Sequence, residues 1–158
     1  MTNDRSNELK AALQARLEGS QFPGVDVSRA WALISEVLEG QVVELFYAGL
    51  LPEGGYSEIP RPALQVVVCT SALVYECDFS ASTMRYDVSS IMNVYRLTET
   101  WNEEQSVEGP PRKKLSVKVD FVNYQLGLSL QLAAYGDEAE ELHVFARALC
   151  GLTVARAK

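Results

Sequence analysis

The sequence predicts a mainly β (α+β) fold in which helices precede and follow a run of antiparallel strands. Apolar residues recur with helical spacing before residue 40 and after residue 137, and they alternate with polar residues over most of the chain between. Strands that follow one another without an intervening helix are typical of a meander that closes into a barrel or a sandwich. A chain of 158 residues is long enough for one such domain with an extension.

Residues 1–40 are expected to form a helical extension of two helices that precedes the β domain of residues 41–158. In the first helix, four apolar residues line one face: Leu9, Ala12, Leu13 and Leu17. Asp26 or Ser28 can cap the second helix, and Gly40 marks its end. The apolar face of this second helix contains Ala30, Trp31, Ile34, Val37 and Leu38.

Seven strands are expected, near residues 41–50, 63–70, 72–79, 84–88, 91–101, 112–121 and 124–135. Alternation is clear from Leu73 to Phe79, and only Ser71 and Ala72 separate this run from the strand before it, which predicts a hairpin. A mixed period after Ile91 favours a bulge near Met92. Alternation is most regular in the last two strands, which carry Leu115, Val117, Val119 and Phe121, and then Tyr124, Leu126, Leu128, Leu130 and Leu132.

The final segment is expected to be an amphipathic helix. Asp137 can cap its start, and Glu140 three residues later completes a pattern like a capping box. Its apolar stripe consists of Ala139, Leu142, Phe145, Ala146 and Leu149, which must pack on another apolar surface.

This order of elements resembles the pleckstrin-homology-like (PH-like) superfold over residues 41–155. The segment VVVCTSALVYECDF looks like the second and third strands of bacterial PH-like domains, and MRYDVSSIMNVYR looks like the fourth and fifth. The resemblance implies a seven-stranded antiparallel barrel closed by the C-terminal helix. It also implies a binding role, because members of the family mostly bind lipid head groups, peptides or partner proteins.

Charge argues against two of the possible partners. The net charge of −7 disfavours nucleic acids and anionic membranes, whose binding depends on basic residues. In PH-like domains that bind phosphoinositides, a basic loop joins the first two strands. The corresponding loop here, residues 51–61, contains Glu53 and Glu58 against a single Arg61. Phosphoinositide binding is therefore not expected.

The candidate binding residues are the basic cluster of Arg112, Lys113, Lys114 and Lys118. Three of the four have one parity along the predicted strand and would share a sheet face. They could hold a phosphate or an acidic partner. Alternatively, they could balance acidic residues on neighbouring strands, such as Glu76 and Asp78, or protect an edge strand from pairing.

No catalytic or metal site is expected, and no cofactor. His143 is the single histidine, and neither a nucleophile elbow nor a phosphate-binding motif is present. Glu76 and Asp78 share one face of a strand, where they could act as a metal or acid pair or simply be solvated. Three cysteines, an odd number, indicate reduced thiols in the cytoplasm. The first residues lack the apolar stretch of a signal peptide, and no segment is long enough to span a membrane.

Together these features predict a cytoplasmic, non-catalytic binding or assembly domain that contacts another protein, a peptide or a second copy of itself. An exposed sheet edge and the two N-terminal helices are the expected contact surfaces. Two alternatives are a small acidic chaperone for a secreted or unfolded partner, and a barrel that binds a small apolar ligand inside it.

Overall fold

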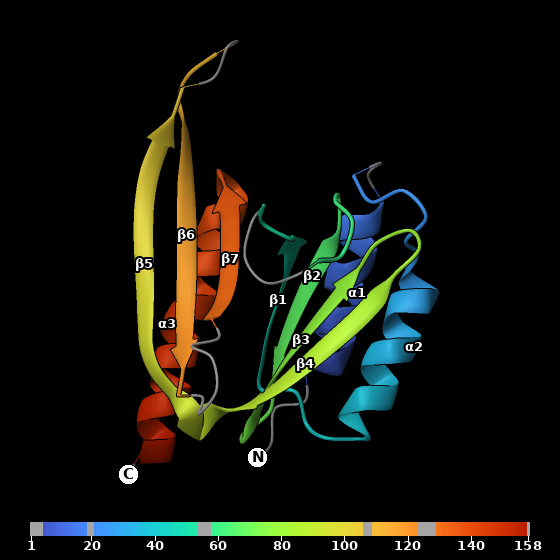
Figure 1. Ribbon diagram of the computed structural model, residues 1–158, viewed down its shortest axis with the longest axis vertical. Coiled ribbons are helices and arrows are strands. Elements are labelled where there is room, and N and C mark those ends of the chain that lie inside the picture. Colours follow the sequence, from blue (N-terminus) through green and yellow to red (C-terminus); the bar gives the residue numbers. More distant parts are fainter. Residues whose placement is uncertain (1–4, 19–20, 54–57, 106–108, 123–128, 158) are drawn as a thin grey trace. The chain divides into compact units, whose positions relative to one another are not determined.

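The computed structural model describes residues 5–18, 21–53, 58–105, 109–122 and 129–157, which contain three α-helices and seven strands (Figure 1). The chain divides into two compact units. The N-terminal unit comprises Met1–Leu51 and Ser57–Ser90, and the C-terminal unit comprises Pro52–Tyr56 and Ile91–Lys158. Among the helices of the described residues, none combines the length and the hydropathy that crossing a bilayer requires.

A four-stranded antiparallel sheet forms the centre of the N-terminal unit. Its strands lie in the order β1 (Leu45–Leu50), β2 (Leu64–Cys69), β3 (Leu73–Phe79) and β4 (Met84–Ser90). The predicted hairpin at residues 71–72 is confirmed, since Thr70 accepts the Leu73 amide on its hydroxyl at 3.0 Å. Ser80 accepts the Thr83 amide in the same way between β3 and β4. These side-chain bonds satisfy turn amides and set the register of both hairpins.

The helices α1 (Ser6–Leu17) and α2 (Val27–Leu38) pack on one face of this sheet. Asp26 caps α2 as predicted, because its carboxylate accepts the Arg29 amide at 2.8 Å. The Arg29 guanidinium donates to the Ser80 carbonyl at 2.7 Å, which ties the start of α2 to the β3–β4 turn. The shared core contains Leu9, Leu13, Ala30, Ile34, Leu38, Ala48, Val66, Val68, Tyr75, Cys77 and Phe79.

The C-terminal unit is a three-stranded antiparallel sheet covered by one helix. Its strands lie in the order β5 (Val94–Glu104), β6 (Arg112–Phe121) and β7 (Ser129–Tyr135), and α3 (Asp137–Ala157) packs on β6 and β7. The predicted apolar stripe of α3 is confirmed, since Ala139, Leu142, Phe145, Ala146 and Leu149 are all buried. Residues 124–128 of the seventh predicted strand lie outside the described residues.

The prediction of a single seven-stranded closed barrel is wrong. The strands form two sheets, of four and three strands, and the strands of the described residues do not close into a barrel. After β4 the chain enters a short 3-10 turn, η1 (Ile91–Asn93), and β5 then pairs with β6. A register shift between Val94 and Arg96 lies close to the bulge expected near Met92. The mainly β class and the C-terminal helix are as predicted, but α3 lies on an open sheet.

Candidate functional site

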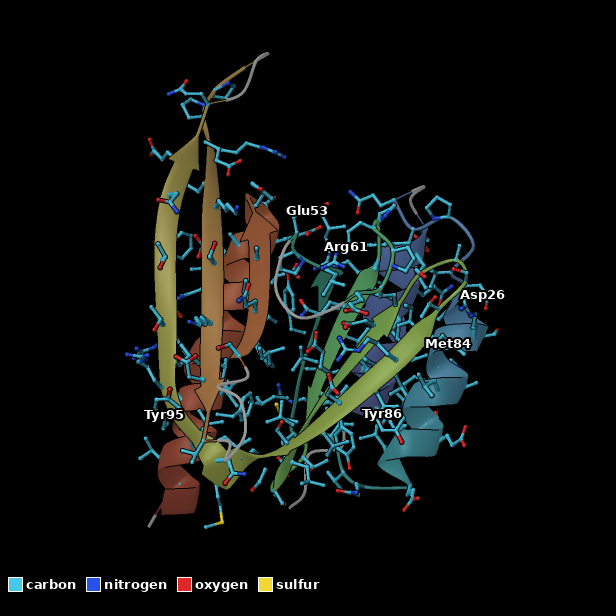
Figure 2. All side chains as sticks on the ribbon, viewed as in Figure 1. Asp26, Glu53, Arg61, Met84, Tyr86 and Tyr95 are labelled. Carbon is cyan, nitrogen blue, oxygen red and sulfur yellow. The ribbon has the colours of Figure 1, made fainter. Side chains whose placement is uncertain are left out.

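The helix-side face of the first sheet continues onto its edge strand, β4. Residues directly opposite each other in an antiparallel pair point to the same face. Three residues of β4, Met84, Tyr86 and Val88, stand opposite Phe79, Cys77 and Tyr75 of β3, which belong to the core beneath α2. Figure 2 shows Met84 and Tyr86 along β4 beside α2. The apolar face of the sheet therefore extends across all four strands.

The two helices leave this last strand uncovered. Tyr75 on β3 is 4% exposed, whereas Val88 opposite it is 44% exposed. Met84 and Tyr86 are 44% and 49% exposed. An uninterrupted row of exposed large apolar residues on an edge strand is unusual for a surface that only water contacts, because burial of apolar area is the main favourable term in folding and association.

A groove of about 300 Å³ lies between the C-terminal half of α2 and the last two strands of the first sheet. All of its lining residues belong to the N-terminal unit. This volume is at the small end of the range of ligand-binding clefts. The lining consists of Leu33, Glu36, Val37 and Glu39 from α2 and its cap, Gln41 after it, Tyr75 from β3, and Tyr86 and Val88 from β4.

The groove has apolar side chains on both walls and an acidic rim, and polar atoms make up the larger part of its accessible lining. Leu33 and Val37 on α2 face Tyr86 and Val88 on the sheet, and the exposed side chains of Glu36 and Glu39 lie at the helix end. The last turn of α2 contains no basic residue. Because the C-terminus of a helix carries the negative end of its dipole, both carboxylates add to a potential that is already negative.

Two backbone and side-chain features fix this end of the groove. Glu39 caps α2 in the left-handed conformation, with φ of 50°, and its amide donates to the Ser35 carbonyl. Left-handed geometry is common where a helix ends, although glycine usually occupies that position. The side-chain amide of Gln41 donates to the Tyr75 hydroxyl at 3.0 Å and thereby orients the polar end of that ring.

The predicted basic cluster lies elsewhere, on β6 of the C-terminal unit. Arg112 and Lys114 both lie over the ring of Tyr135, at 4.5 and 5.5 Å from its centroid. Lys114 pairs with Glu104 at 3.5 Å, and Lys118 lies 3.7 Å from Asp120. By register, Lys113 falls on the opposite face.

Of the two structural roles suggested for this cluster, edge protection does not apply, and charge balance involves Glu104 on the neighbouring strand β5 in place of Glu76 and Asp78. Because β6 is the central strand of its sheet, the cluster does not protect an edge strand. Its carboxylate partners come from its own sheet, whereas Glu76 and Asp78 lie on β3 of the other sheet. Binding by these four residues stays a prediction.

The acid pair suggested by the sequence is engaged with neighbouring side chains. The Glu76 carboxylate accepts a hydrogen bond from the side-chain amide of Gln65 at 2.9 Å. The Asp78 carboxylate accepts one from the Arg85 guanidinium at 3.3 Å. The part of the chain that the structure describes contains no group of three or more histidine, cysteine or acidic residues placed to hold a metal ion.

Two of the cysteines and the histidine have structural surroundings that explain them. Burial raises the pKa of the Cys69 and Cys77 thiols to about 12, and Asp78 and Glu76 contribute at Cys77, so both stay protonated and unreactive. The His143 Nδ1 lies 3.0 Å from the Glu99 carboxylate, and its ring lies beside Trp101.

The chain matches no family model, no curated protein and no solved structure. Sequence reasoning missed the groove, although two signals of it are present. Met84, Tyr86 and Val88 alternate with polar residues on a strand with only one neighbour, and Leu33 and Val37 widen the apolar arc of α2 beyond the residues that the core buries.

Proposed function

We propose that the protein is a non-catalytic binding domain. It binds a segment of a partner protein, through the apolar side chains of that segment, in the groove between α2 and β4. The observation that carries this proposal is the exposed row of Met84, Tyr86 and Val88, which extends the face on which α2 packs. Aromatic residues and methionine are enriched in the buried centres of protein interfaces.

The groove suits a protein segment for a physical reason. A segment placed there would remove from water both the row on β4 and the side chains of Leu33 and Val37. Each square ångström of apolar surface removed from water contributes about 25 cal/mol, so a few buried side chains supply several kcal/mol before the cost of ordering the segment.

The proposal does not depend on four other predictions made from the sequence. Membership of the PH-like superfold, a cytoplasmic location, the absence of enzymatic activity and a chaperone role are not needed for it. The strands of the described residues form no closed barrel, so an apolar ligand would occupy a groove of this kind and not a barrel interior.

The proposal can be tested by selecting peptides from a displayed random library on the full chain. We expect the enriched peptides to bind the wild type and to lose at least about tenfold in affinity on Val88→Lys, because a charge in an apolar contact costs about 1.4 kcal/mol or more. Titration calorimetry on individual synthetic peptides measures this loss.

Val144→Lys is the matched control, because Val144 is 67% exposed on α3 of the C-terminal unit. Both substitutions replace an exposed valine and are expected to leave the melting temperature nearly unchanged. Enriched peptides that bind Val88→Lys as tightly as the wild type would contradict the proposal, and so would peptides that lose affinity only on Val144→Lys.

A further inference from the structure

We infer that the groove receives a basic amphipathic helix, which lies alongside α2 as a third helix on the face of the first sheet. This inference rests on the proposed function and narrows it to one class of partner segment. Its basis is the placement of one helical wall, one sheet wall and two carboxylates around a single groove.

The walls of the groove favour a helix over an extended strand. One wall is α2, through Leu33 and Val37, and the other is the sheet face, through Tyr86 and Val88. Neighbouring helices in a layer lie about 8–10 Å apart, so a helix beside α2 would contact both walls at once. A strand added to β4 would lie in the plane of the sheet, about 4.8 Å away, and would not reach α2.

The pattern of exposed residues also matches a helix. Over two turns an amphipathic helix presents about three apolar side chains on one face, at positions i, i+3 or i+4, and i+7. The groove offers four apolar contacts for them, from Leu33, Val37, Tyr86 and Val88.

Charge selects basic helices among amphipathic ones. Glu36 and Glu39 are exposed at the rim, three positions apart, at the negative end of α2. Lysine or arginine residues one turn apart on a bound helix have the spacing to meet both carboxylates. A helix with glutamate at those positions would meet like charges, so the same groove disfavours acidic segments.

The test uses three synthetic probes of about 16 residues, a length at which an isolated helix is marginally stable in water. The first is a helix with a leucine stripe flanked by lysines. The second replaces every lysine with glutamate. The third keeps the leucine and lysine content but alternates the two residue types, which favours a strand. Fluorescence anisotropy measures their affinity for the full chain, and amide chemical shifts locate the site.

We expect the lysine helix to bind about tenfold more tightly than its glutamate twin at low salt, with the largest shifts in residues 33–39 and 86–88. The double variant Glu36→Lys with Glu39→Lys is expected to reverse this preference. The control double variant, Glu8→Lys with Glu140→Lys, changes the net charge equally at exposed positions on α1 and α3 and is expected to retain it.

Several outcomes would overturn the inference. The inference fails if the rim variant still prefers the lysine helix over the glutamate helix, or if the control variant loses this preference to the same extent. It also fails if the alternating or the acidic probe binds more tightly than the lysine helix, or if the amide chemical shifts change outside the groove. Dimerisation of the chain in light scattering that Val88→Lys abolishes would assign the groove to a second copy.

The two proposals can fail separately. If the library yields peptides that depend on Val88 but are extended or acidic, the proposed function stands and the helix inference falls. If the library peptides bind Val88→Lys as well as the wild type, both fall.

Discussion

Residues on one face of the first sheet differ in exposure, because the layer formed by α1 and α2 covers β3 and ends before β4. Tyr75 and Val88 are direct neighbours in register, yet one is buried and the other is nearly half exposed. Alternation fixes the face on which each residue lies, but only packing fixes whether that face is covered. This separation makes Val88 suitable for mutagenesis, since an exposed side chain can be changed at small cost to the free energy of unfolding.

Asp120 provides a pH-dependent prediction at the same scale. Its carboxylate accepts the Ser129 hydroxyl at 2.6 Å and the Arg96 guanidinium at 3.1 Å. The Ser129 hydrogen bond lowers its pKa below the ordinary 3.8 against the effect of burial, and Arg96 and Lys118 lower it further. A carboxyl group whose pKa is lower in the folded state stabilises the protein above its unfolded pKa and stops doing so as pH falls through the folded value.

We therefore expect Asp120→Asn to lower the free energy of unfolding at pH 7 by about 1.5–3 kcal/mol, the range of hydrogen bonds to charged groups. The difference from the wild type should shrink below pH 4. Urea unfolding at several pH values measures it. Ser129→Ala should raise the Asp120 pKa in a carboxyl-carbon NMR titration, and an unchanged value would show that this hydrogen bond is not responsible.

At the scale of the element, α2 carries more apolar surface than its own sheet buries. Ala30, Ile34 and Leu38 form the stripe that belongs to the core, while Leu33 and Val37 are only partly buried and line the groove. Together these five residues have the spacing i, i+3, i+4, i+7 and i+8 of an ordinary amphipathic helix. The feature that distinguishes α2 is incomplete coverage, because Leu33 and Val37 pack only partly on the core and line the groove with the surface that remains.

The end of α2 departs from what stability alone would favour. Its cap, Glu39, has a side chain in the left-handed region and a negative charge at the negative end of the dipole. We expect Glu39→Gly to raise the free energy of unfolding by about 1–2 kcal/mol by removing both costs, and Glu39→Gln to raise it by less than 1 kcal/mol by removing only the charge.

Chemical denaturation of the two variants separates backbone strain from charge. Both should weaken binding of the lysine helix, because each removes one rim carboxylate. Equal stabilities of the glycine and glutamine variants would show that the left-handed conformation costs the folded chain nothing.

At the scale of the whole molecule, the sequence predicts the elements better than their assembly. The helix cap at Asp26, the hairpin at residues 71–72 and the stripe of α3 depend on local patterns, and the structure has each of them. The barrel depended on which strands pair, and alternation contains no information on that. The residues Ile91–Asn93, where the chain leaves one sheet and starts the other, read equally well as a bulge within a single sheet.

The sequence did not predict the candidate site for a related reason. A groove forms where covered and uncovered parts of one apolar face meet, and this border depends on how far α1 and α2 extend across the sheet. The charge pattern singles out Arg112, Lys113, Lys114 and Lys118 because they lie close together in the sequence. Glu36, Val37 and Val88 become neighbours only through the fold.

Net charge and rim charge should affect different rate constants for the lysine helix. The net charge of −7 attracts a basic segment over distances comparable to the Debye length, about 10 Å at 0.1 M salt, and thereby raises the association rate constant. Contacts with Glu36 and Glu39 form only in the complex and mainly slow dissociation.

We expect stopped-flow measurements to show an association rate constant that falls at least about tenfold between low salt and about 0.5 M salt. The control variant Glu8→Lys with Glu140→Lys should lower this constant and leave the dissociation rate constant unchanged. The rim variant Glu36→Lys with Glu39→Lys should in addition raise the dissociation rate constant about tenfold, because it replaces two close attractions with repulsions. If the two variants changed both rate constants alike, the field of the whole molecule would account for the selectivity, and the rim carboxylates would have no part in it.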